Sequence, residues 1–177
     1  MLWKPMLAVA LATVVTLGAG AGGALAQRAT ADSASKSFIK SAIEANYSEI
    51  DIGKLAQEKG QSDAVKQFGK MLVEDHSAAN QKAIAAANEI GVSPPSGSSI
   101  VEKGTYAKLK MLSGASFDRS FAKSMVSDHE ADIKDFEKES SKPDAAGQFA
   151  KATLPTLRKH LQEAQKLQQQ TQTTGSR

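Results

Sequence analysis

Three histidines carry most of the chemistry that this sequence offers. His76, His129 and His160 each lie on an apolar stripe of helical period, so each imidazole is expected on the buried side of its helix. Imidazole nitrogen is a common ligand of iron, zinc and copper. Carboxylates that such a site would use occur on the same or neighbouring predicted helices. The candidate acidic ligands are Glu49, Asp128 and Asp132.

Two interpretations of the histidines are open from the residues alone. Helical bundles that hold two iron ions carry Glu-x-x-His on two helices, but the residues three positions before these histidines are Val73, Val126 and Leu157. The missing signature argues against a di-iron site. It favours core histidines whose ring nitrogens are each satisfied by a hydrogen bond, with no cofactor. The alternative is one divalent transition-metal ion bound by two or three histidines and one or two carboxylates.

A short internal repeat relates two of the histidines. The segments 68–76 and 121–129 share five of nine residues, namely Phe, Lys, Val, Asp and His. The repeat predicts a pseudo-twofold bundle in which His76 and His129 take equivalent positions facing the interior. Because successive residues of a helix point about 100° apart, the Asp before each His is expected to face another helix. The hydrogen-bond partner of each His should therefore come from another helix, with Glu49, Asp51 and His160 as the leading candidates.

Composition and motifs exclude several functional classes. The chain has 177 residues and no Cys, which excludes disulfides, Cys-ligated zinc, a thiol nucleophile and c-type haem attachment. It contains no phosphate-binding loop, no dinucleotide fingerprint and no H-E-x-x-H motif, so we do not expect an enzyme of those classes. The net charge of +3 is spread over interspersed charges without a basic block. Nucleic acid is therefore not an expected partner.

The elements that position the histidines are predicted to be helices. Period-3.6 patterns run over residues 35–59, 62–90, 116–140 and 144–169, with a shorter helix over 99–112. The stripes place Leu72 and Leu157 in the core and leave Lys70 and Lys159 on the surface. The first and last connections are short, and the middle one is long. This pattern predicts an all-α, ferritin-like four-helix bundle with a long central crossover that contains a short helix.

The N-terminus resembles a targeting segment. Lys4 precedes an apolar run, small residues follow, and the run closes with Ala24-Leu25-Ala26, the layout of a secretory signal peptide over residues 1–26. The alternative is an uncleaved membrane anchor over residues 6–26, which is just long enough to span. We expect a linker over 27–34, the bundle over 35–169 and a disordered tail over 170–177. Both interpretations of the N-terminal segment, signal peptide or anchor, place the bundle in the periplasm or cell envelope.

Three sequence blocks resemble one known family. They are the repeat F-x-K-x-[LM]-V-x-D-H, the block Glu49-Ile50-Asp51-Ile52-Gly53-Lys54-Leu55-Ala56, and the block Thr153-Leu154-Pro155-Thr156-Leu157-x-x-His160-Leu161. They are similar to the bacterial exported family called domain of unknown function 4142, over about Phe38–Leu167. The resemblance implies a ferritin-like bundle of the periplasm or envelope and implies no activity.

The functional expectation is correspondingly broad. We expect a non-enzymatic envelope protein that serves binding, assembly or stress protection, with an envelope protein or the membrane surface as partner. The alternative expectation is a metal-binding or metal-dependent redox bundle that uses the core histidines and carboxylates. The sequence leaves the oligomeric state open.

Overall fold

The structure, a computed structural model, describes residues 31–174, and the side chains of residues 101, 102 and 174 are outside that description. The predicted signal peptide or anchor (residues 1–26) and the start of the linker lie outside the described residues. All regular structure within residues 31–174 is helical, which confirms the all-α prediction. The helices are α1 (Ser33–Lys59), α2 (Asp63–Glu89), α3 (Ile100–Lys110), α4 (Gly114–Glu139) and α5 (Ala145–Thr174). None of them has an apolar stretch long enough to cross a bilayer.

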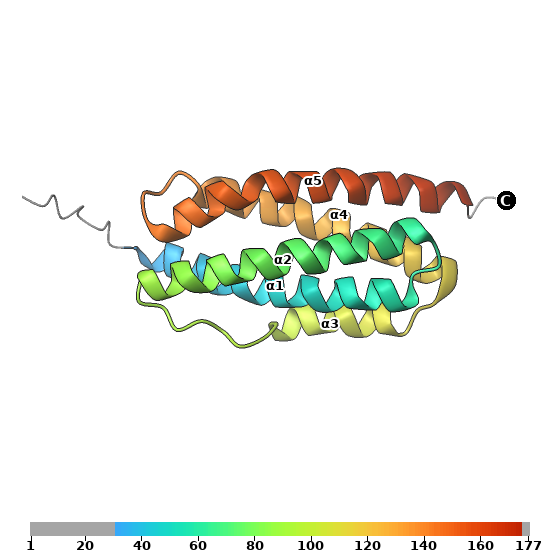
Figure 1. The fold of residues 1–177 in the computed structure, drawn as a ribbon, viewed down its shortest axis with the longest axis horizontal. Helices are drawn as coiled ribbons and strands as arrows, with labels where there is room; N and C mark the ends of the chain where they lie inside the picture. Colours follow the sequence, from blue (N-terminus) through green and yellow to red (C-terminus); the bar gives the residue numbers. More distant parts are fainter. Residues whose placement is uncertain (1–30, 175–177) are drawn as a thin grey trace, which may run out of the picture.

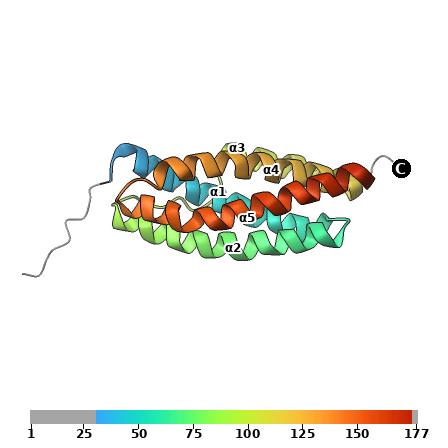
Figure 2. The ribbon, with the colours of Figure 1, turned by 90° about the horizontal axis from the view of Figure 1, so that it is seen from above.

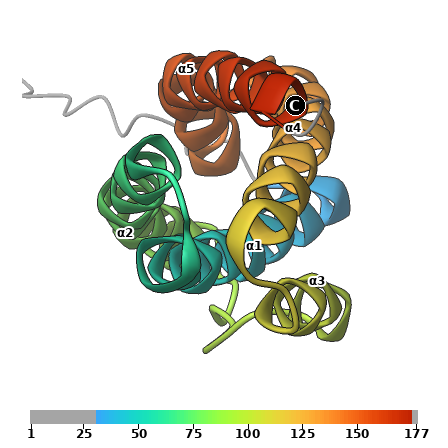
Figure 3. The ribbon, with the colours of Figure 1, turned by 90° about the vertical axis from the view of Figure 1, so that its right-hand side faces the viewer.

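Four long helices form the bundle, and the short one lies outside it. Viewed along the bundle, α1, α2, α5 and α4 follow one another around a square, so α2 lies diagonally opposite α4 and α1 diagonally opposite α5 (Figure 3). Helix α3 packs on the outer side of α1 and α4 (Figures 2 and 3). The connection that contains α3 returns along the length of the bundle, and therefore α2 and α4 run in the same direction (Figure 1).

Local residue chemistry explains where the helices begin and end. Asp32 accepts a hydrogen bond from the backbone N–H of Ser35 at 2.7 Å, and Ser62 accepts one from Val65 at 3.3 Å, as N-caps do. Gly91 follows α2 with a φ of 71°, a left-handed conformation that glycine adopts without steric cost. Serine before a helix and glycine after one are the residue types favoured at these positions.

Helix α5 is longer than its predicted range. It continues to Thr174, so residues 170–174, which were predicted to belong to a disordered tail, are helical. The reason is packing: Leu167 and Thr171 are buried, one helical turn apart, and the Thr171 hydroxyl donates to the Leu167 carbonyl oxygen at 2.9 Å. The apolar stripe of α5 therefore extends one turn further than the Gln-rich composition indicates.

Helices α1 and α2 approach closely through two glycines. A Cβ atom added at Gly53 would lie 2.7 Å from the Gly69 carbonyl oxygen, and one added at Gly69 would lie 2.6 Å from the Gly53 carbonyl oxygen. Both distances are too short for a carbon–oxygen contact, so only glycine fits at this crossing. The close contact holds α1 and α2 in one register, which fixes the residues of α1 that face the middle of α2.

The core consists of two apolar clusters with polar residues between them. One cluster includes Ile43, Phe136 and Leu157, and the other includes Leu72, Phe121 and Met125. Leu72 and Leu157 are buried and Lys70 and Lys159 are exposed, as the stripes predict. Buried polar residues lie between the two clusters on every long helix, and Ser48, Glu49 and Asn80 are among them. Four others, one from each long helix, are called the polar layer below: Asn46, His76, His129 and His160.

Candidate metal centre

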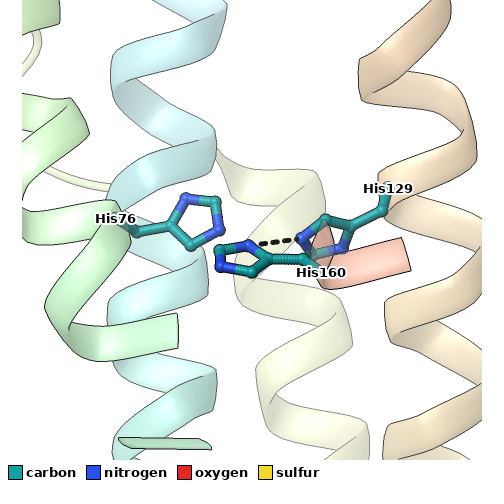
Figure 4. A group of neighbouring side chains, drawn as sticks. All are labelled: His76, His129 and His160. Carbon is teal, nitrogen blue, oxygen red and sulfur yellow. Dashed lines mark hydrogen bonds between the residues drawn. The ribbon is translucent and has the colours of Figure 1, made fainter. Parts of the chain in front are cut away.

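The three histidines meet in the middle of the bundle. They come from α2, α4 and α5, and one nitrogen from each ring lies within 4.8 Å of the others (Figure 4). His129 and His160 are fully buried, and His76 is 4% exposed. The ring centroids are 5.2 Å apart for His76 and His160, and 5.3 Å apart for His129 and His160. The imidazoles thus form one cluster rather than three separate core contacts.

The helix arrangement explains why His76 and His129 converge. The repeat places them at the same point of two helices that run in the same direction on opposite sides of the bundle. Each therefore faces the interior at the same level, which agrees with the predicted equivalence. His160 enters this level from α5, which lies between α2 and α4 around the bundle, and its ring is close to both of the others.

Asn46 fixes the proton position on His76. The Nδ1 atom of His76 lies 2.9 Å from the Asn46 side-chain oxygen, so Nδ1 carries the proton and donates it. In the neutral ring, Nε2 then presents a lone pair. This Nε2 atom is buried and has no hydrogen-bond partner.

A backbone carbonyl fixes the proton position on His129. Its Nδ1 atom lies 2.9 Å from the carbonyl oxygen of Met125, one turn earlier on α4. A carbonyl oxygen can only accept, so Nδ1 donates and Nε2 presents a lone pair.

Asp75 fixes the proton position on His160. The Nε2 atom of His160 lies 2.9 Å from a carboxylate oxygen of Asp75, whose side chain is 37% exposed on α2. An ionised carboxylate accepts, so Nε2 donates and Nδ1 presents a lone pair. The Asp before His76 therefore contacts a histidine of another helix, as the sequence predicts.

The three outer hydrogen bonds leave three lone pairs directed at one another. The Nε2 atom of His129 lies 3.3 Å from the Nδ1 atom of His160, a hydrogen-bond distance (Figure 4). Because His129 donates its proton to Met125 and His160 donates its proton to Asp75, two neutral rings have no proton left to lie between these two nitrogens. Three neutral rings therefore place two lone pairs against each other, and a proton or another cation between them would relieve this repulsion.

The environment opposes protonation of all three rings. Burial lowers the pKa of His76 well below its ordinary value of 6.5, and the neighbouring His129 and His160 lower it further. Burial, with His160 beside it, lowers the pKa of His129 to about 4. Burial also lowers the pKa of His160, although Asp75 acts in the opposite direction. At neutral pH the metal-free cluster is therefore three neutral imidazoles with converging lone pairs.

These pKa shifts predict that the metal-free protein loses stability in weak acid. The unfolded chain binds protons at its histidines as the pH falls through 6.5, whereas folded His129 binds one only near pH 4. Stability is therefore fully present above pH 6.5 and falls toward pH 4, by on the order of 3 kcal/mol for His129 alone. Urea unfolding of metal-free protein at pH 7, 5.5 and 4 measures this. A free energy of unfolding that stays constant over this range would contradict the prediction.

The predicted carboxylate ligands are not part of the cluster. The three-histidine group contains none of Glu49, Asp128 and Asp132. Glu49 is buried on α1, Asp132 is partly exposed on α4, and Asp128 lines a surface groove between α3 and α4 together with Thr105 and Lys108. Asn46 and Asp75 are the side chains hydrogen-bonded to His76 and His160. Asn46 was visible as a polar residue on the apolar stripe of α1, and Asp75 as half of the repeated Asp-His pair.

The expectation that histidine partners come from other helices is met in part. His160 pairs with His129 and with Asp75, both from other helices. His76 pairs with Asn46 of α1 and not with Glu49 or Asp51. His129 donates its Nδ1–H within its own helix, to the Met125 carbonyl oxygen that the preceding turn presents.

Comparison with known proteins gives one match. The family model described as "Domain of unknown function (DUF4142)" matches residues 21–167, which confirms the resemblance seen in the three sequence blocks. No curated protein and no solved structure matches the chain.

Proposed function

Since the chain belongs to the DUF4142 family, whose description names no activity, we propose from the site itself that the protein binds one divalent transition-metal ion through His76, His129 and His160. The observation that carries the proposal is the set of outer hydrogen bonds. Each histidine donates its outward N–H to Asn46, Met125 or Asp75 and turns its other nitrogen inward. Metal-binding histidines in proteins almost always make such a hydrogen bond with the nitrogen that does not bind the metal.

The distances fit an ion after a small adjustment. Two nitrogens bound to one tetrahedral ion at about 2.0–2.1 Å lie about 3.3–3.4 Å apart. The inward nitrogens of His129 and His160 are already 3.3 Å apart, and all three lie within 4.8 Å. Only the ring of His76 has to move inward, and its Nε2 atom makes no hydrogen bond that would have to be broken.

The donor set favours a transition-metal ion that is neither hard nor soft in its choice of ligands. Three imidazole nitrogens suit zinc, copper, iron or nickel, whereas calcium and magnesium prefer oxygen ligands. An arrangement of histidines satisfied purely by hydrogen bonds is the competing explanation. It leaves Nε2 of His76 buried without a partner and places two lone pairs 3.3 Å apart. A cation at the centre removes both costs.

We further propose a ferritin-like relationship and an exported location. The fold argument is the topology: two antiparallel hairpins, α1–α2 and α4–α5, are joined by one connection that runs the length of the bundle. The site differs from carboxylate-rich di-iron sites because its ligands are all neutral nitrogens. The argument for export is the signal-peptide pattern of residues 1–26. A binding or stress-related role outside the cytoplasm, in contact with the envelope, is compatible with a metal-binding bundle.

Elemental analysis tests the metal proposal directly. We expect the full chain, purified from the periplasm without an affinity tag, to contain close to one transition-metal ion per molecule. Removal of the ion with a chelator should lower the melting temperature, and readdition should restore it. At an ion concentration of 100 times Kd the stabilisation is about 3 kcal/mol, or about 5–10 °C for a domain of this size. Protein without metal, whose melting temperature does not respond to zinc, copper, cobalt or iron, would refute the proposal.

A further inference from the structure

The three-histidine cluster supplies too few ligands to close a tetrahedral site. Each histidine offers one inward nitrogen, and the cluster includes no carboxylate among the described residues. The chain has no Cys, so no thiolate can serve as a fourth ligand. Zinc sites with four protein ligands are structural, whereas those with three keep a position for water or for a molecule from solution. An ion held by these histidines therefore has one coordination position that the cluster does not fill.

The charge of the site indicates what occupies that position. A histidine that binds a metal through one nitrogen is a neutral ligand, and the carboxylate hydrogen-bonded to the cluster is Asp75, on His160. Three neutral ligands with one hydrogen-bonded carboxylate leave a buried dication with excess positive charge, which is costly in a low-dielectric core. The surrounding residues strengthen this effect because Phe68, Leu72 and Met125 are buried and apolar. A monovalent anion bound to the ion would neutralise the excess charge.

The burial of the cluster limits the size of this ligand. His129 and His160 have no exposed surface, and His76 has almost none. The Asp75 side chain contacts the cluster and is partly exposed to solvent. It lies on the side of the bundle where α2 packs against α5. An ion or ligand that enters beside Asp75 has to pass between packed side chains, which favours small species over large ones.

Asn46 leaves a second polar atom of this layer without a partner. Its side-chain oxygen accepts from His76, but its Nδ2 atom is buried and has no hydrogen-bond partner. A buried N–H group without an acceptor costs free energy. Water or a small anion in the polar layer is an acceptor of the required type.

We infer that the bound ion keeps one coordination position open for a small exogenous ligand, either water or a small monovalent anion. This inference rests on the proposed metal site. The protein would then be a receptor for such anions or a centre that activates them, rather than a closed structural metal site. Glu49 is the rival occupant, because it is buried on α1, three residues after Asn46. If the Glu49 carboxylate binds the ion, the position is closed.

Cobalt spectroscopy distinguishes the open site from the closed one. The full chain is loaded with Co²⁺ in a chloride-free buffer, and azide is added while the visible absorption bands are recorded. We expect the bands to shift with a saturable, one-site dependence on azide. Sulfate, which is larger and divalent, should leave the spectrum unchanged. The same azide response is expected in Glu49→Gln and in the matched control Glu163→Gln, which replaces a partly exposed residue of α5.

The outcomes separate this inference from the metal proposal. Tight cobalt binding without any azide response in the wild type, together with a response in Glu49→Gln, would show that Glu49 closes the site. That result would overturn the open position and leave the three-histidine metal site intact. Cobalt binding that responds to azide in none of the three proteins would also overturn it. Failure of cobalt to bind at all would overturn both proposals.

Discussion

Replacing His129 with alanine is expected to lower the affinity for a divalent transition ion by about 100- to 1000-fold. Binding of structural zinc by four ligands contributes roughly 10–16 kcal/mol, so one ligand accounts for about 2.5–4 kcal/mol. His129 presents its inward nitrogen at 3.3 Å from that of His160, and no other described side chain offers a nitrogen at this place. Isothermal titration of metal-free protein with Zn²⁺, in the presence of a competing chelator, measures the change.

Two further variants make this experiment specific. Lys70→Ala removes an exposed side chain of α2 that pairs with Glu74 rather than with the cluster, and it should leave the affinity unchanged. Asp75→Asn keeps an oxygen that accepts from His160 but removes the negative charge, and we expect a smaller loss of about 10- to 100-fold. The His129→Ala protein should also show no rise in melting temperature when metal is added. Equal affinities for the wild type and the His129→Ala variant would mean that the cluster is not the metal site.

Truncation of the core leucines is expected to have the largest effect on folding. Leu72→Ala and Leu157→Ala should each lower the free energy of unfolding by about 2–5 kcal/mol, because each removes a buried side chain and leaves a cavity. The two residues belong to different apolar clusters, one on each side of the polar layer. Both halves of the core are thereby tested. Urea unfolding of metal-free protein at pH 7 measures the change without a contribution from metal binding.

The matched controls come from the exposed faces of the same helices. Lys70→Ala on α2 and Lys159→Ala on α5 remove side chains of similar length that lie in solvent, so each should change the free energy of unfolding by no more than about 0.5 kcal/mol. Lys70 makes one i, i+4 ion pair with Glu74, at 3.7 Å and largely exposed, and such a pair contributes little. A lysine variant as unstable as the leucine variants would show that the helix faces are assigned incorrectly.

The donor chemistry of the cluster separates it from carboxylate-bridged metal sites in bundles. Those sites use several Glu side chains to hold two ions, and the carboxylates balance the charge of the metals. Here the inward groups are neutral nitrogens, and the one carboxylate hydrogen-bonded to them, Asp75, acts from outside. A neutral ligand set would suit one ion and would leave it electrophilic. This difference follows from the sequence, in which valine or leucine occupies the position three residues before each histidine.

The helical fold could be predicted from the sequence because its determinants are local. Apolar residues at intervals of three and four specify a helix and the face that it buries. The Ser62 cap, the left-handed Gly91 and the buried positions of Leu72 and Leu157 each depend on a few neighbouring residues. The same reasoning placed all three histidines in the core and paired His76 with His129 through the internal repeat. The end of α5 was predicted too early because the packing of Thr171 depends on other helices.

Only the tertiary structure decided which residues surround the imidazoles and which nitrogen of each ring faces inward. The sequence shows Glu49, Asp128 and Asp132 as acids near core positions, yet the side chains hydrogen-bonded to His76 and His160 are Asn46 and Asp75. A residue of a helix points about 100° away from its neighbour, so a contact depends on the rotation and register of the opposing helix. The Gly53–Gly69 contact sets that register for α1 and α2, which brings Asn46 to His76. The direction of each lone pair follows from such contacts between helices, and these are a property of the assembled bundle.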